Sequence, residues 1–369
     1  MSMNTLMKPI TNIPMPSNIS YPWNIGSLLG MLLTMQIITG ILLSMHYLPE
    51  SEMAFASIIN ITQETNSGWM TRFIHTNAAS LFFLLIYLHI SRTIYYKSYH
   101  LIKPWLTGWS LLILLMMTSF LGYTLPWGQM SFWAATVITN LLSTIPYIGK
   151  SLTYWLWGSH NISNPTLNRF FSLHLCIPFV MMFLTMTHLF TLHLTGSSNP
   201  LGTNSNLDKI PFNPYFTTKD LLTAMTILLL TILICTTDPY ITLSHDNSIP
   251  ANPLSTPSHI QPEWYFLFAY SILRSVPNKL GGTLALLLSI AILLTLPLHM
   301  PSQIPNTFNP KSKILFTMFI ITFIMLSWLG SCPISPPFNI ITPIFTTLYF
   351  LFFLTYPMPF LWMNTPDSS

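Results

Sequence analysis

Residues 69–96 read WMTRFIHTNAASLFFLLIYLHISRTIYY, a long apolar segment that contains two histidines, His75 and His89. Residues 167–194 read LNRFFSLHLCIPFVMMFLTMTHLFTLHL and contain a second such pair, His174 and His188. A helix needs about 20 apolar residues to cross the hydrocarbon core of a bilayer. Each segment is therefore predicted to be a membrane-spanning helix that carries two imidazoles inside the membrane.

The composition of the whole chain agrees with a membrane environment. Hydrophobic residues make up 51% of the 369 residues and charged residues only 6%, whereas a soluble domain carries about 25% charged residues. We expect an all-α integral membrane protein with about eight spans, although seven or nine remain possible. The spans are predicted near residues 23–45, 69–96, 105–125, 167–194, 220–237, 280–300, 313–330 and 340–362. Pro297 interrupts the sixth, and Pro357 and Pro359 interrupt the last.

The distribution of basic residues predicts the orientation. An even number of spans places both termini on one side, and the side richer in lysine and arginine faces the negative compartment. The N-terminal side holds Lys8, Lys97, Lys103, Lys209, Lys219, Lys311 and Lys313, with Arg92 at a helix end. The other side holds fewer basic residues and three glutamates. We therefore expect both termini in the negative compartment.

The histidine pairs predict two metal-binding sites. Their 14-residue spacing returns to within about 40° of the starting direction on a helix and rises by about 21 Å. With eight spans both helices run the same way, so His75 shares a depth with His174, and His89 with His188. Two facing helices would form two stacked bis-imidazole sites, and imidazole is an axial ligand of haem iron. The sequence thus predicts two haems that pass electrons, because both axial positions are taken.

Glycines repeat the same interval. Gly26 and Gly40 in the first span, and Gly108 and Gly122 in the third, are also 14 residues apart. A missing side chain lets a flat macrocycle approach the backbone. We expect the first four spans to form a bundle around two stacked b-type haems.

Two arginines lie three residues from the histidines of the second span. Arg72 precedes His75, and Arg92 follows His89. Residues three apart lie on the same helix face, and a guanidinium is a strong partner for a carboxylate. We interpret both as candidate partners of haem propionates, although they could equally be surface anchors.

Longer motifs give the sequence a family resemblance. They are GYTLPWGQMSFWAATVITNLLSTIPYIG at 122–149, DKIPFNPY at 208–215 and PEWYFLFAYSILRSVPNKLGG at 262–282. Together with the paired histidines, they closely resemble the mitochondrial cytochrome b family, the dihaem subunits of ubiquinol–cytochrome c reductase (respiratory complex III). The resemblance runs over nearly the whole chain. It implies non-covalent haem b at both histidine pairs, with His75 and His174 nearer the positive side.

The resemblance also implies a site for quinol oxidation on the positive side. Glu263 would take or relay a quinol proton, and Tyr265 and Tyr270 would line the pocket. A carboxylate after Pro262 in an apolar loop should have a raised pKa, which suits proton relay. Judged from the residues alone, Glu263 could also simply begin a helix.

A second quinone site, for reduction, is implied on the negative side by His193, Ser197, Lys219 and Asp220. These residues cluster at the end of the fourth span and the start of the fifth, so proximity is plausible without the resemblance. Asp220 could instead be a carboxylate that stabilises a helix N-terminus.

The sequence departs from the family at several positions. Ala134 replaces a usual glycine beside the quinol-oxidation pocket, so we expect a narrower pocket and weaker binding of bulky inhibitors. Leu194 replaces an acidic residue after His193. Ser91 and Thr93 replace glycines around Arg92, which weakens its assignment.

The predicted activity is quinol oxidation on one side, electron transfer through two haems, and quinone reduction on the other side, which contributes to a proton gradient. The sequence contains no four-cysteine set and no Cys/His cluster suited to an iron–sulfur centre. The resemblance therefore implies iron–sulfur and cytochrome c-type partner subunits, accessory subunits, a homodimer of the complex and no nucleic acid. It also implies the mitochondrial inner membrane, with the termini in the matrix. Residues 1–200 would form the haem domain, and residues 201–369 a C-terminal domain carrying the PEWY loop.

Two other classes of protein are considered. A polytopic proton-coupled transporter could use the histidines as a proton relay, but it would not explain the glycine interval. A stand-alone transmembrane haem protein would need the histidines but not the PEWY loop.

Overall fold

A computed structural model describes residues 12–298 and 308–356 of the chain. Within these residues, eight helices are long and apolar enough to cross a membrane, which confirms the predicted all-α membrane fold. They are α2 (Ile25–Ser44), α4 (Gly68–Tyr95), α5 (Ile102–Thr124), α8 (Asn164–Thr195), α9 (Phe212–Thr237), α11 (Lys279–Ala291) with its 3-10 extension η6 (Ile292–Leu298), α12 (Pro310–Ser331) and α13 (Phe338–Thr355).

The predicted spans agree with these helices within a few residues, except at the start of the fifth and at the end of the last, which was predicted at residue 362, outside the described residues. The fifth helix begins at Phe212 rather than near residue 220, because a helix can extend beyond the apolar run that marks the membrane core. Pro357 and Pro359 lie outside the described residues, so the predicted break of the last span cannot be compared.

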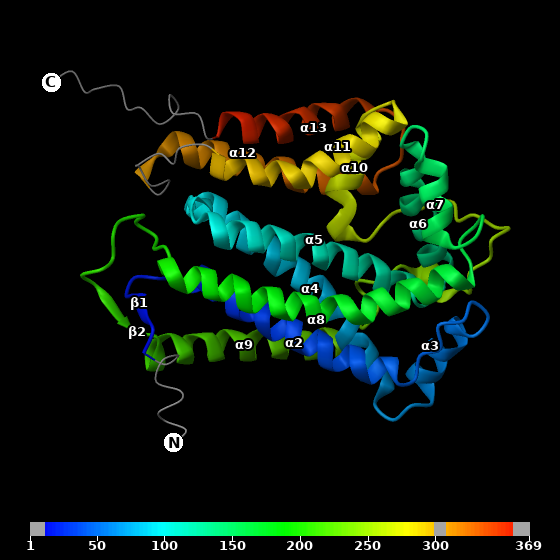
Figure 1. Ribbon diagram of the computed structural model, residues 1–369, viewed down its shortest axis with the longest axis horizontal. Coiled ribbons are helices and arrows are strands. Elements are labelled where there is room, and N and C mark those ends of the chain that lie inside the picture. The colour runs from blue at the N-terminus through cyan, green and yellow to red at the C-terminus, as the bar shows by residue number, and fades with distance from the viewer. Residues whose placement is uncertain (1–11, 299–307, 357–369) are drawn as a thin grey trace.

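The long helices form two groups (Figure 1). In the first group, α2 packs on α4, α5 packs on α8, and α2 also contacts α8. Helix α9 packs on α2 and α4 of this group, although the predicted division at residue 200 assigns it to the C-terminal domain. The second group combines α11, α12 and α13 with the short helix α10 (Leu267–Ser275), which contacts all three.

Hydrogen bonds from tryptophans connect the two groups. The backbone carbonyl of Leu293 in η6 accepts a hydrogen bond from α5. The indole of Trp105 donates to that carbonyl at 3.0 Å, and Trp109 donates to the carbonyl of Ile290 at 3.1 Å. These two indole hydrogen bonds tie α11 and η6 to α5.

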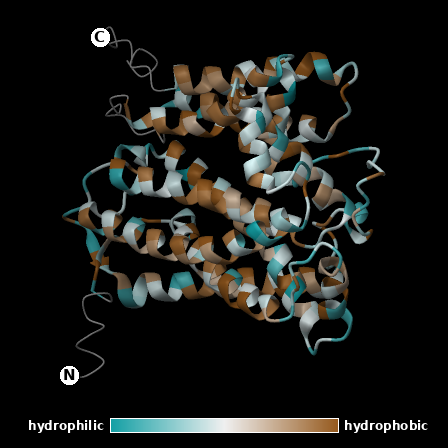
Figure 2. Ribbon diagram, turned by 45° about the vertical axis from the view of Figure 1, so that its right-hand side comes forward, coloured by the Kyte–Doolittle hydropathy of each residue, from teal (hydrophilic) through white to brown (hydrophobic). Residues whose placement is uncertain are grey.

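Shorter elements lie at the two ends of the bundle (Figure 1). Helices α3 (Ala54–Gln63), α6 (Gln129–Asn140) and α7 (Gly149–Trp157) lie near one end. The 3-10 helix η5 (Trp264–Phe266) packs against the middle of α4, where Tyr265 stacks on Phe83. At the other end, β1 (Pro14–Pro16) pairs antiparallel with β2 (Lys209–Pro211). Figure 2 shows hydrophobic residues along the long helices and hydrophilic residues mainly in the end loops.

The outer faces of the bundle are apolar. Phe183 and Phe190 of α8 and Leu229 of α9 are 71%, 65% and 68% exposed. Large apolar side chains at this density need a lipid environment rather than water. The interior of the protein lies between the helices, and the four histidines point into it.

Candidate functional site

Two cavities lie one above the other inside the group formed by α2, α4, α5 and α8. The first has a volume of about 230 Å³ and is lined by His75 and His174. The second has a volume of about 460 Å³ and is lined by His89 and His188. The structure therefore brings His75 together with His174, and His89 with His188. These are the pairs that the direction of the predicted spans indicated.

The imidazoles of the first cavity face each other. Their ring centroids are 6.2 Å apart, with an interplanar angle of 81°. Two imidazoles bound to one metal ion through bonds of about 2 Å place their centroids roughly 6 Å apart. The spacing of the two rings therefore suits a shared metal ion.

Neighbouring helices set the tautomers of both rings. His174 Nδ1 lies 2.8 Å from the carbonyl oxygen of Thr118, which can only accept. His75 Nδ1 lies 2.8 Å from the hydroxyl of Thr39, whose own hydrogen goes to the carbonyl of Met35. Both Nδ1 atoms therefore donate, which leaves each Nε2 with a free lone pair, as in metal-binding histidines.

The second pair is set differently. His188 Nδ1 lies 2.9 Å from the hydroxyl of Thr107, whose hydrogen goes to the carbonyl of Lys103, so His188 repeats the first-cavity pattern. His89 Nδ1 instead lies 3.3 Å from Nη2 of Arg92. Because a guanidinium only donates, His89 Nδ1 accepts here, and the ring hydrogen is on Nε2. Metal binding by His89 would require Arg92 to turn toward another partner.

The four repeated glycines all face these imidazoles. A Cβ atom at Gly122 would overlap the ring of His174. At Gly40 it would lie 3.1 Å from Cε1 of His75, and at Gly108 3.2 Å from Cε1 of His188. At Gly26 it would lie 3.7 Å from Cε1 of His89, which is an ordinary contact. The glycines of α2 and α5 thus leave room beside each histidine.

Arg92 and Ser98 line the second cavity, and each has a buried polar atom. Arg92 Nε and Ser98 Oγ have no hydrogen-bond partner among the described residues, and both residues line the cavity. The Arg92 guanidinium also lies 5.4 Å from the ring of Trp23. Buried donors without partners are rare, and here they suit an anionic group such as a haem propionate. Sequence reasoning missed Ser98, which has no distinctive spacing.

Arg72 lines the first cavity but has a protein partner. Its Nη1 donates to the hydroxyl of Thr62 at 2.8 Å. The imidazole pairs and the glycine clearances suit a haem group in each cavity, and the buried donors add to this fit in the second.

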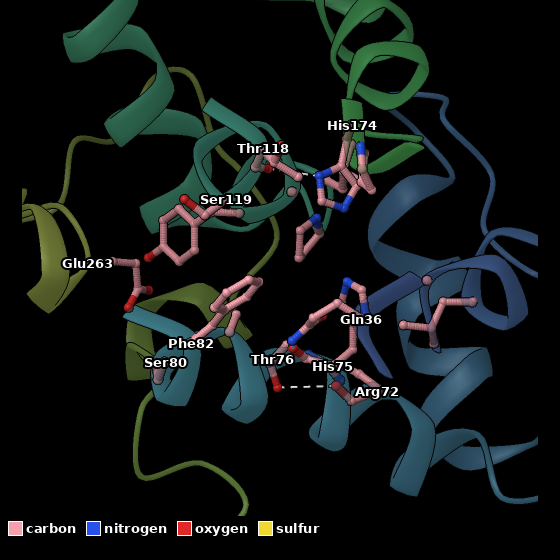
Figure 3. Close-up of a pocket in the computed structure, with 18 of the residues that line it drawn as sticks. Gln36, Arg72, His75, Thr76, Ser80, Phe82, Thr118, Ser119, His174 and Glu263 are labelled. Atoms are coloured by element: carbon pink, nitrogen blue, oxygen red, sulfur yellow. Dashed lines mark hydrogen bonds between the residues drawn. The ribbon is translucent and has the colours of Figure 1, made fainter. Parts of the chain in front are cut away.

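A carboxyl group enters the first cavity from a loop outside the four helices. Glu263 immediately precedes η5, and Figure 3 shows it at the side of the cavity opposite Gln36. Burial raises the pKa of Glu263 to about 7, and a hydrogen bond with the Tyr123 hydroxyl opposes this rise. A carboxyl group with a pKa near neutral can exchange protons at physiological pH.

The aromatic candidates occupy different positions. Tyr265 lines the first cavity and stacks on Phe83 with a centroid distance of 3.8 Å, and its carbonyl accepts a hydrogen bond from the Tyr87 hydroxyl. Tyr270 and Ala134 are not among the residues that line this cavity. Tyr270 instead packs against Arg274, 5.2 Å from the guanidinium carbon, and Ala134 is buried in α6. The predicted narrowing of the pocket by Ala134 stays a prediction.

Most of the other quinone candidates line the second cavity. His193, Ser197 and Asp220 do so, and Asp220 accepts a 2.7 Å hydrogen bond from the Asn24 side chain. Lys219 is not among the lining residues, and its ammonium group donates to the carbonyl of Ile19 at 2.9 Å.

Of the three residues beside His193 and Arg92 at which the sequence departs from the family, only one lines the second cavity. Leu194 points outward from α8 and is 62% exposed. Thr93 lines the second cavity, whereas Ser91 does not.

Asn77 is a buried polar residue of α4 that sequence reasoning missed. Its amide nitrogen donates to the carbonyl of Pro239 at 2.9 Å, and its amide oxygen accepts from the Thr242 hydroxyl at 2.9 Å. These bonds attach the 239–242 loop to α4. Tyr240 and Thr242 of this loop line the first cavity. An intramembrane asparagine two residues after a histidine was the available signal.

Comparisons with known proteins agree with this arrangement. The family model "Cytochrome b/b6/petB" matches residues 10–196, and the model "Cytochrome b(C-terminal)/b6/petD" matches residues 250–350. A solved structure described as "Hyperthermophilic respiratory Complex III" is similar with a TM-score of 0.90 and 30% sequence identity, over 96% of this chain and 95% of that chain. This chain belongs to the cytochrome b family.

Proposed function

We propose that this chain is the dihaem cytochrome b subunit of a respiratory complex III, which oxidises ubiquinol at the first cavity and reduces ubiquinone at the second. The observation that carries the proposal is the pair of stacked cavities, each with two facing-helix histidines. The similarity to a complex III structure over nearly the whole chain supports it. Two haems b, when bound, would pass single electrons between the two ends of the bundle.

Residues around the first cavity are suited to receive protons from quinol. Glu263 is the candidate proton acceptor, because its pKa is raised to about 7 by burial. The Tyr123 hydroxyl bonds to its carboxyl group and orients it. Tyr265, 5% exposed, helps to exclude water from this wall. The proton would leave quinol for a Glu263 carboxylate oxygen, and Tyr270 remains a candidate only through the family resemblance.

Residues of the second cavity are suited to deliver protons to quinone. His193 and Asp220 both line it and both carry exchangeable protons. The side chains of Asn24 and Ser27 hydrogen-bond to the Asp220 carboxyl group and hold it at the cavity wall. Ser197 could bind a quinone oxygen. Lys219 would act only through neighbouring residues, or after its hydrogen bond to the Ile19 carbonyl is broken.

The proposed assembly follows from the activity. Quinol gives up two electrons, and the second acceptor must come from other subunits, for which the resemblance implies an iron–sulfur protein and a cytochrome c-type subunit. We further propose accessory subunits, a homodimer of the complex, and location in the mitochondrial inner membrane with both termini in the matrix.

An optical and kinetic experiment on the purified complex tests this function. The reduced complex should give low-spin spectra of two b haems with different potentials, and ubiquinol should reduce both. Absence of haem spectra would refute the proposal. Haem without reduction by quinol would favour the stand-alone haem protein.

A further inference from the structure

Four side chains lie at the level between the two cavities. Among the residues that the structure describes, only Leu33, Phe82, Leu115 and Met181 line both. Each comes from a different helix, α2, α4, α5 and α8. All four are buried, with exposed fractions of 7%, 6%, 8% and 3%. We call these four residues the midpoint layer.

The midpoint layer follows the same sequence interval as the candidate ligands. Phe82 lies seven residues from His75 and from His89, and Met181 lies seven residues from His174 and from His188. Leu33 and Leu115 divide the two glycine intervals in the same way. Seven residues are close to two helical turns, about 10.5 Å of rise, so all four side chains lie midway between the two sites.

The chemistry of the layer opposes the passage of water. None of the four side chains carries a hydrogen-bonding group stronger than the thioether sulfur of Met181. A buried water needs two to four polar partners, and apolar spaces of this kind stay dry. The Thr118 hydroxyl lies 3.7 Å from that sulfur, but its hydrogen is also directed to the Leu114 carbonyl at 2.7 Å.

We propose that the midpoint layer is a proton barrier, which prevents water and protons from passing through the bundle between the two cavities. The inference rests on the proposed function, because the barrier matters when protons are released at one end and taken up at the other. Electrons can cross an apolar layer of this thickness by tunnelling, but protons need a chain of hydrogen-bonding groups. Without the barrier, protons would return through the subunit itself.

Met181 and its neighbour Met182 offer a matched test. Met182 is 42% exposed and is not among the residues that line the cavities. The complex carrying Met181→Gln, Met182→Gln or Met181→Leu is reconstituted in sealed liposomes that contain an internal pH dye. A potassium–valinomycin potential is imposed without quinol, so the dye reports passive proton entry alone. Haem content is measured by difference spectra in the same preparations.

We expect Met181→Gln to raise proton conductance several-fold, because glutamine nearly matches methionine in size but can hold water. Met182→Gln and Met181→Leu should match the wild type. Unchanged conductance in Met181→Gln at normal haem content would overturn the barrier, as would an equal rise in Met182→Gln. If Met181→Gln does not assemble, Leu115→Asn tests the same level from α5, by the same two criteria. Missing haem in the wild type would instead refute the proposed function.

Discussion

The two cavities share one scaffold but differ in the groups that complete them. Both lie between the same four helices and have two histidines and two glycines at the same interval. The first is completed by Glu263, which comes from a loop outside these helices. The second is completed by Arg92 within the bundle and by Asp220 of α9. The 14-residue interval of histidines and glycines therefore accounts for what the two sites have in common. The loop that carries Glu263 and helix α9, which carries Asp220, account for most of the difference in their chemistry.

A second difference concerns how the imidazoles are held. Both rings of the first cavity donate through Nδ1 to groups on neighbouring helices. In the second cavity, His188 does the same, but His89 accepts from Arg92 on its own helix. The first site is thus preorganised for metal binding, whereas the second couples His89 to the position of Arg92.

Removing one histidine should give the largest effect and should separate the two sites. We expect His75→Leu to abolish haem binding in the first cavity and to leave the second haem, and His89→Leu to do the reverse. Each variant should lose about half of the b-type absorbance, because in the proposed arrangement each haem would need both of its axial histidines. Redox titration identifies the remaining haem by its potential. Loss of the same haem in both variants would contradict the assignment.

Replacing Glu263 should affect only the first cavity. We expect Glu263→Gln to slow quinol oxidation by about 10²-fold, in the range for loss of a general base. In the wild type, the rate should rise as pH increases through about 7, because Glu263 must be ionised to accept a proton and burial raises its pKa to about 7. The variant should lose this rise.

Stability should respond to Glu263 in the opposite direction. Because the folded pKa lies above the usual value of 4.5, the contribution to stability is complete below about pH 4.5 and is lost as pH rises through about 7. Thermal unfolding of wild type and Glu263→Gln across this range measures it. A rate profile that is identical in both proteins would exclude Glu263 as the proton acceptor.

The glycines allow a graded comparison between the cavities. We expect Gly122→Ala to reduce haem content in the first cavity, because its Cβ would overlap the His174 ring. Overpacking of this kind costs about 1–3 kcal/mol. Gly26→Ala is the matched control, since its Cβ would make only a 3.7 Å contact with His89. Equal haem loss in the two variants would show that clearance from the imidazole is not what matters.

Arginine replacement should give the smallest effect. We expect Arg92→Gln to lower the potential of the second haem by up to about 60 mV, a tenfold change for a one-electron couple, because a buried positive charge is removed. Arg72→Gln should shift the first haem less, since Thr62 already occupies the Arg72 guanidinium. Potentiometric titration of both variants checks the order, and a larger shift in Arg72→Gln would reverse it.

Much of this arrangement could be predicted from spacing. A helix has a fixed rotation and rise per residue, so the 14-residue intervals of His75, His174 and their partners place side chains on one face at two depths. Polar contacts could not be predicted in this way. That Lys219 bonds to Ile19 and that Asn77 holds the 239–242 loop depends on how distant segments pack.

By itself, the sequence determined the membrane fold, the approximate spans and the pairing of the histidines, because hydrophobic length and helical periodicity are local properties of a chain. The tertiary structure alone decided which imidazole nitrogen is free, which donors lack partners, and which loop supplies a carboxyl group to the first cavity. These depend on atoms brought together from separate helices, and no local pattern encodes such distances. The midpoint layer depends on both the sequence and the tertiary structure. Its seven-residue interval is present in the sequence, but its position between two cavities results from the packing of the four helices.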